Sequence, residues 1–273
     1  MYSGTTLTKF SGRLIGTHQK FDRVARAHME KIIPDDSVFP KAGKILHFEG
    51  KNGPDAIKRK SPAKDEPWHY YSPFDDDDSE LIELIRSHYE RLIKELKIGN
   101  EERAAFESAW LAHALVDGLT PAHHYPYEKE IEELWDGSKD ERTTVAKKWF
   151  PPADTKRGRA AKTWKYLGPK GLINTHVLFE MGVATIAAPL GLGEALPTSE
   201  RLEEARELGP IEVFKRSARE IAVLDMYNRY QKRGWSTKLI YDTRHKLCPT
   251  IVQTVTLVWY LALVDAGLVK IKP

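Results

Sequence analysis

The chain has 273 residues, 41% of them hydrophobic and 30% charged, which is the composition of a globular protein long enough to bury a sizeable core. Its net charge of +3 at pH 7 is too small to argue by itself for a nucleic-acid or membrane partner. The single cysteine, Cys248, excludes a disulfide framework within the chain. Any zinc site would therefore be built from histidines and carboxylates.

The N-terminal segment is polar and leads into the first predicted helix. Residues 1–15 contain no apolar run of signal-peptide length, so we expect a protein that is cytoplasmic, or secreted with its signal removed. Apolar residues then recur at helical spacing from Thr17 to Ile32, and Pro34 ends the pattern. His18, in the first turn of this helix, is the first candidate metal ligand.

The segment over residues 50–73 contains four prolines and is predicted to be a long loop. Such loops inside a compact domain are usually functional or mobile. This one contains Asp55 and His69, both candidate metal ligands. The four aspartates at positions 75–78 are interpreted as charge ahead of the next helix, because they lack the ligand spacing of a calcium loop. Aromatic residues that could wall a pocket surround His69, namely Trp68, Tyr70, Tyr71 and Phe74.

Helical periodicity dominates the rest of the chain. An amphipathic pattern over residues 79–98 is followed by Asn100, which is placed to cap the next helix. No alternating strand pattern competes, so the predicted fold class is all-α, with one multi-helix domain over residues 1–273. The longest apolar stretch, 251–268, includes Asp265 and is predicted to be buried rather than membrane-spanning. Further helices are predicted over 128–135, 169–189, 210–234 and 236–268, the last broken or kinked at Pro249. The segment 136–168 is basic and expected to be irregular in part.

The clearest chemical signal lies on the helix that is predicted to end before Pro121. His113 and Asp117 are four residues apart, so a helix presents both on one face. The turn forced by Pro121 can bring His123 or His124 back beside that pair. Two imidazoles and a carboxylate that converge at a helix end form a metal-ligand arrangement. The alternative for any single histidine is a core side chain with satisfied hydrogen bonds.

A second pair with the same spacing lies in the helix predicted over residues 169–189. His176 and Glu180 share one face of a helix whose other residues are mostly apolar or small. A buried carboxylate needs a partner, which a metal beside His176 would supply; a lysine or arginine is the alternative. The candidate ligands are too many for one tetrahedral zinc and about right for two or three: His18, Asp55, His69, His113, Asp117, His123, His176 and Glu180. Clustered divalent metals in hydrolases clamp the oxygens of phosphoesters.

The order of these residues carries a family resemblance. The run His113-x-x-x-Asp117-x-x-x-Pro121-x-His123 resembles the signature of the bacterial zinc-dependent phospholipase C family, which the related single-strand nucleases share. The resemblance spans residues 15–185 and implies the all-α fold of that family. The companion elements follow in the same order, as His18 at the first helix, Asp55 and His69 fourteen apart, and a distal His176-x-x-x-Glu180.

The resemblance implies three metal sites. The first would be held by Asp55, His69, His113 and Asp117. The second would be held by His123, His176 and Glu180, and the third by His18 and the bridging Asp117. The family completes the third site with an N-terminal tryptophan, but no tryptophan precedes His18; either Met1 or a processed terminus reaches the site, or the third metal is weak or absent. Asp55 is the implied residue that orients or deprotonates the attacking water.

The predicted function is that of a zinc-dependent phospholipase C. Such an enzyme would bind two or three Zn²⁺ ions, contact a membrane surface peripherally and cleave phospholipids on the glycerol side of phosphate. The alternative is a nuclease or nucleotidase of the same fold; nucleic acid is not favoured because the nucleases typically carry Asp where Glu180 stands. A third hypothesis is a metal-stabilised module without turnover. Choline specificity is not expected, because Ala56 follows Asp55 and Glu66 replaces an aromatic residue.

Overall fold

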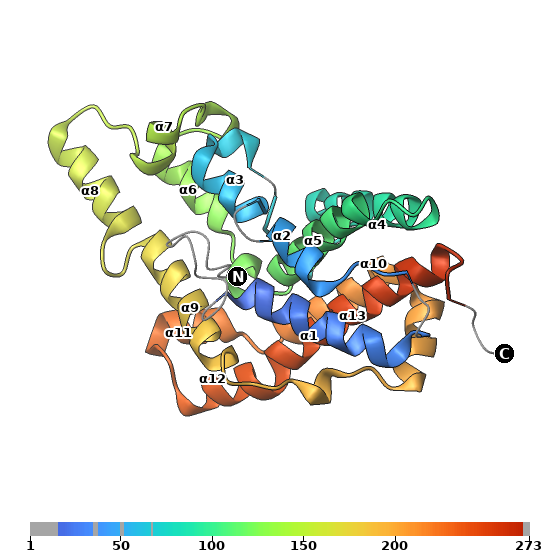
Figure 1. Ribbon diagram of the computed structural model, residues 1–273. Coiled ribbons are helices and arrows are strands. Elements are labelled where there is room, and N and C mark those ends of the chain that lie inside the picture. The colour runs from blue at the N-terminus through green and yellow to red at the C-terminus, as the bar shows by residue number, and fades with distance from the viewer. Residues whose placement is uncertain (1–15, 35–37, 50–51, 67, 270–273) are drawn as a thin grey trace.

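Helices make up the fold that the computed structural model describes over residues 16–34, 38–49, 52–66 and 68–269 (Figure 1). These residues contain no strand, so the predicted all-α class is confirmed. The α-helices are α1 (Thr17–Ile32), α2 (Ala42–Glu49), α3 (Pro54–Lys60), α4 (Glu80–Lys97), α5 (Glu101–Gly118), α6 (Tyr127–Trp135), α7 (Val145–Trp149), α8 (Lys156–Leu167), α9 (Leu172–Ala187), α10 (Ser199–Ala222), α11 (Met226–Arg233), α12 (Thr237–Asp242) and α13 (Cys248–Asp265). Short turns join them: η2 (Ala63–Asp65), η3 (Pro121–His124), η4 (Lys139–Glu141), η5 (Gly193–Ala195) and the π-helical η6 (Thr243–Leu247).

The apolar helix α13 forms the centre of the main hydrophobic core. Helices α1, α4, α5 and α10 pack against it. The indole of Trp259 on α13 donates a hydrogen bond to the carbonyl of Ser108 on α5, at 3.1 Å. The stretch Thr237–Asp265 is long and apolar enough to cross a membrane, but 78% of its most apolar window is buried inside the fold. That burial agrees with the predicted core helix.

Helix α5 carries two of the candidate ligands, His113 and Asp117. Its predicted cap forms, since the side-chain oxygen of Asn100 accepts a hydrogen bond from the backbone N–H of Arg103 at 3.3 Å. Gly118, its last residue, packs so closely that an added Cβ would lie 2.5 Å from Leu81. Pro121 then begins η3, which returns the chain toward α5 as the sequence predicted.

The segment predicted as a long loop, residues 50–73, contains α3 and η2, so that prediction is wrong in part. Pro54 occupies the first turn of α3, where its missing N–H would have no helical partner in any case. The partly irregular segment 136–168 contains α7 and α8, whose first turns donate backbone hydrogen bonds to the side chains of Thr144 and Thr155. Helices of five to seven residues, such as α3 and α7, are too short for apolar periodicity to reveal them.

The C-terminal helices differ from the prediction in their boundaries. Gly209, with φ of 73°, and Pro210 kink α10, which begins at Ser199 rather than at the proline. The backbone is not broken at Pro249, which lies in the first turn of α13. The π-helical η6 passes directly into α13, with helical backbone angles at Leu247 and Cys248.

A smaller apolar cluster lies apart from the main core, where α6 and α8 pack together. Residues 127–167, from α6 to α8, are called the α6–α8 lobe below. Figure 1 shows this lobe at one end of the molecule with α8 at its outer edge, and α9 leads from it back to the body. The cluster consists of Tyr127, Ile131, Leu134, Trp135 and Tyr166.

Candidate metal centre

Five parts of the chain bring seven of the eight candidate ligands together. Helix α1 supplies a histidine from its first turn, α5 and α9 each supply a histidine and a carboxylate, and η3 and the segment after η2 supply one histidine each. Burying this many polar side chains in one place requires that they bind one another or a ligand. The buried residues are His18, His69, His113, Asp117, His123, His176 and Glu180.

Asp117 lies at the centre of the first group. Its Oδ2 is 2.7 Å from Nδ1 of His69 and 3.1 Å from Nε2 of His113. Its Oδ1 is 3.2 Å from Nε2 of His18 and 3.7 Å from Nδ1 of His123. The rings of His18 and His113 stack with their centroids 4.2 Å apart. The two carboxylate oxygens therefore face different imidazoles, as a bridging ligand would.

Glu180 organises the second group. Its Oε1 lies 3.1 Å from Nε2 of His123 and 3.1 Å from Nε2 of His176. The two rings are stacked, with centroids 5.1 Å apart and planes 16° from parallel. Two imidazoles are therefore among the partners of Glu180 in the described part of the chain.

The spacing of these donor atoms fits tetrahedral zinc. Two ligand atoms that each lie about 2.1 Å from one zinc are about 3.4 Å apart. The imidazole nitrogens of His18 and His113 lie 3.2 and 3.1 Å from oxygens of Asp117. In each of two groups all ligand atoms lie within 4.8 Å of one another, and the groups are His18, His113 and Asp117, and His123, His176 and Glu180.

The protonation states of the centre suit metal binding at most positions. Burial opposes the charge of Asp117 and Glu180, yet nearby positive charge, to which the surrounding imidazoles contribute, holds the pKa of both carboxyls well below the usual range. Burial also opposes protonation of His113, but Glu49 and Asp117 raise its pKa well above the usual value. At His123 burial prevails and lowers the pKa to about 4. A metal ion at His113 would have to displace a proton, whereas His123 is already neutral at pH 7.

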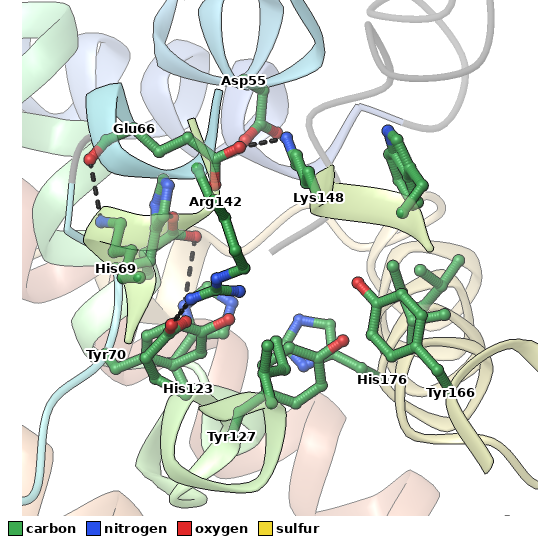
Figure 2. Close-up of a pocket in the computed structure, with 18 of the residues that line it drawn as sticks. Asp55, Glu66, His69, Tyr70, His123, Tyr127, Arg142, Lys148, Tyr166 and His176 are labelled. Atoms are coloured by element: carbon green, nitrogen blue, oxygen red, sulfur yellow. Dashed lines mark hydrogen bonds and ion pairs between the residues drawn. The ribbon is translucent and has the colours of Figure 1, made fainter. Parts of the chain in front are cut away.

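Asp55, the candidate base, lies at the edge of the centre rather than inside it. Its Oδ1 is 3.8 Å from Nε2 of His113, and its side chain is 13% exposed. It comes from the first turn of α3 and lines the same pocket as most of the buried candidate ligands. Figure 2 shows Asp55, Glu66 and Lys148 pointing toward one another at one side of this pocket. Neither compact three-residue group includes Asp55 or His69.

Two carboxylates behind the centre were missed by the sequence reasoning. Glu49, at the end of α2, is fully buried. Its two carboxylate oxygens lie 3.1 and 3.3 Å from Nδ1 of His113. Its Oε1 also lies 3.7 Å from Nδ1 of His18. Asp22 is buried on α1, and burial followed by the charge of Glu49 raises its pKa well above the usual value. Asp22 had a sequence signal, since it follows His18 by the same spacing of four residues. Glu49 had none.

The neighbouring histidine His124 is placed differently from His123. Its Nε2 lies 2.8 Å from the carbonyl oxygen of Gly118, to which it donates a hydrogen bond. The backbone thus occupies a ring nitrogen of His124, while His123 points toward Asp117 and Glu180. The structure therefore places His123, which the family spacing favours, in the centre.

A pocket of about 360 Å³ adjoins the centre (Figure 2). Its wall combines aromatic rings with two buried cations, Arg142 and Lys148. Arg142 forms an ion pair with Glu128, and Lys148 forms one with Glu66. Of the aromatic residues expected around His69, Trp68 and Tyr70 line this pocket, whereas Tyr71 packs into the core and Phe74 is exposed. The α6–α8 lobe contributes further rings from Tyr127, Trp149 and Tyr166.

The third site implied by the family also takes ligands from the N-terminal residue. Residues 1–15, and with them the expectation for Met1, lie outside the described residues. Within the described part, the two side chains expected at that site lie close together, with Nε2 of His18 3.2 Å from Oδ1 of Asp117.

Comparisons with known proteins place the fold but no family. No protein-family model matches the sequence, and no curated protein matches it. Among solved structures, the fold is similar to the alpha-toxin of Clostridium perfringens from avian strain SWCP, with a TM-score of 0.52 and 14% sequence identity. The match covers 98% of this chain and 65% of the toxin chain, so this chain spans about two thirds of the toxin's length. At 14% sequence identity, the similarity to the toxin supports the all-α fold of this chain and nothing beyond the fold.

Proposed function

We propose that the protein is a zinc-dependent phospholipase C, which hydrolyses the phosphodiester bond on the glycerol side of a phospholipid. The observation that carries the proposal is the pair of buried three-residue groups of candidate ligands beside one pocket, with Oδ1 of Asp117 in the first group 3.7 Å from Nδ1 of His123 in the second. Bound zinc ions would activate a water molecule and stabilise the negative charge that develops on the phosphoryl oxygens. The ordered motifs that resemble the zinc-dependent phospholipase C family, and the similar fold of the alpha-toxin, support this assignment.

The residues divide into three proposed sets of ligands. Asp117 would serve two ions, because its two oxygens face different histidines. His69, His113 and Asp55 would complete the first set and His18 the third. The second set would be His123, His176 and Glu180.

Asp55 would act on the attacking water. Its carboxylate lines the pocket beside the first set of ligands, where it can accept a hydrogen bond or a proton from water in the pocket. Deprotonation by Asp55 would direct the water at phosphorus while the diacylglycerol alkoxide leaves from the opposite side. Removal of a general base typically costs about 10²–10⁴-fold in rate.

The test combines metal analysis with two substrates. Protein purified without added metal is analysed for zinc and then incubated with phospholipid vesicles and with single-stranded DNA. We expect about two or three zinc ions per chain, diacylglycerol release from the vesicles and no nucleotide release. Nucleotide release without diacylglycerol would replace the phospholipase by a nuclease. Bound zinc with neither activity would leave a metal-stabilised module.

A pair of variants separates the proposed base from an unrelated histidine. Asp55→Asn should lower diacylglycerol release by about 10²–10⁴-fold while the second set of ligands still binds zinc. His245→Ala, which changes an exposed histidine, should leave both zinc content and turnover unchanged. Equal activity of Asp55→Asn and wild type would contradict the role given to Asp55.

A further inference from the structure

The surface formed by α7, α8 and the segments that join them is strongly basic. Residues 145–170, called the basic surface below, carry eight lysines and arginines and one aspartate, whereas the whole chain has a net charge of +3. Two of these cations form ion pairs: Lys148 pairs with Glu66, and Lys162 pairs with Asp136. The others are exposed, and no carboxylate of the described chain pairs with them: Lys147, Lys156, Arg157, Arg159, Lys165 and Lys170.

Large apolar side chains are exposed among these cations. Val145 is 40% exposed, Phe150 59% and Trp164 70%. A shallow groove joins Phe150 to Trp164, with Lys156 and Arg159 also lining it. Isolated exposed apolar residues need no explanation, but aromatic rings grouped with cations on one groove indicate a binding surface. An amphipathic ring beside a lysine or arginine is typical of side chains at the boundary between water and lipid.

The fold connects this groove to the metal centre through α8. Lys156, Ala160 and Leu167 follow helical spacing along the groove face. Tyr166, the neighbour of Leu167, is buried in the lobe and lines the pocket beside the centre, which Leu167 also reaches. Figure 1 shows α8 at the outer edge of the molecule, where a flat partner can approach it.

We propose that the basic surface docks on a membrane that contains anionic phospholipids. Its exposed cations would lie among the headgroups, and Phe150 and Trp164 would enter the boundary between headgroups and acyl chains. The exposed apolar side chains include the aliphatic Val145 as well as the rings of Phe150 and Trp164. All three can enter a bilayer, whereas a nucleic-acid base could stack only on the two rings. Charge complementarity and this apolar composition together favour the membrane over a nucleic acid.

Docking extends the proposed phospholipid hydrolysis, because it would hold the mouth of the catalytic pocket near its substrate. Membrane docking and phospholipid hydrolysis can be refuted independently of each other. Docking is measured as vesicle binding without turnover, and hydrolysis is measured on a short-chain phospholipid that stays monomeric. A protein that hydrolyses monomers but does not bind vesicles would refute docking alone.

The experiment is cosedimentation of the full chain with vesicles of phosphatidylcholine, with or without phosphatidylglycerol. We expect tighter binding to the anionic vesicles and a loss of that preference at high salt. The triple variant Lys156→Gln, Arg159→Gln, Lys165→Gln should weaken binding to anionic vesicles by on the order of 100-fold. Trp164→Ala should weaken it by on the order of tenfold.

Matched controls come from α4, which carries exposed cations far along the chain from the basic surface. The triple variant Arg91→Gln, Lys94→Gln, Lys97→Gln removes the same charge, and Ile98→Ala removes a side chain that is 65% exposed. Both should bind vesicles like wild type, and all variants should keep wild-type turnover of the monomeric substrate. Docking is overturned if neutral and anionic vesicles bind equally, if the two triple variants weaken binding equally, or if the protein binds single-stranded DNA but no vesicles.

Discussion

The replacement Glu49→Gln should weaken zinc binding although Glu49 is not itself a proposed ligand. Its carboxylate accepts a hydrogen bond from Nδ1 of His113, at 3.1 and 3.3 Å to its two oxygens. With the proton held on Nδ1, Nε2 of His113 remains available beside Asp117. A carboxylate behind a metal-binding histidine fixes its ring and raises its basicity, and loss of such a partner costs about 10–100-fold in metal affinity. Glutamine keeps an acceptor oxygen, so we expect a loss near the lower end, about 1.4 kcal/mol.

The same replacement should affect the metal-free fold far less. The amide occupies nearly the same volume as the carboxylate, so no cavity forms in this fully buried position. It also removes a negative charge beside the buried carboxyl of Asp22, whose pKa burial and Glu49 raise well above the usual value. That relief offsets part of the weaker contact with His113.

The assay is competition for zinc between the metal-free protein and a chromophoric chelator, with thermal unfolding of the metal-free protein measured alongside. Glu107→Gln is the matched control, because Glu107 forms the same kind of buried pair with His88, at 2.6 Å, on α5 but outside the centre. The reasoning is refuted if Glu49→Gln binds zinc as tightly as wild type, or if Glu107→Gln weakens zinc binding to the same extent.

Three further outcomes follow from the centre and its packing. Asp117→Ala should lower the zinc content measured by elemental analysis more than any other single ligand change, because its oxygens face several imidazoles, while His245→Ala should leave it intact. In the metal-free protein, His123 has a pKa of about 4 against about 6.5 unfolded, so the unfolded state binds more protons between these values. The free energy of unfolding should therefore fall by up to roughly 3 kcal/mol as the pH drops through that window, and denaturant titrations of His123→Gln should show a flatter dependence. Gly182→Ala should lower the melting temperature by overpacking, at a cost of about 1–3 kcal/mol, because the added Cβ would lie 2.3 Å from the ring of Trp235.

The parts of the centre that lie on one helix could be predicted from the sequence. A spacing of four residues places two side chains on one helical face whatever the rest of the fold does, so both His113 with Asp117 and His176 with Glu180 were visible. The turn at Pro121 is equally local. The convergence of α1, α5 and α9 depends on packing between distant segments, and only the resemblance to a family indicated it before the structure did.

The place of Glu49 behind the candidate ligands could not be predicted from the sequence. Glu49 contacts a histidine 64 positions away, and its helix α2 has no pattern that points to the centre, so nothing near Glu49 in the sequence distinguishes it from a surface glutamate. The choice between His123 and His124 also depends on the fold. Their positions in the sequence allow either to be a ligand, but a ring nitrogen of His124 is hydrogen-bonded to the carbonyl of Gly118. A histidine becomes a ligand candidate only when its nitrogens are not used by nearby backbone or side chains, and that depends on the assembled fold.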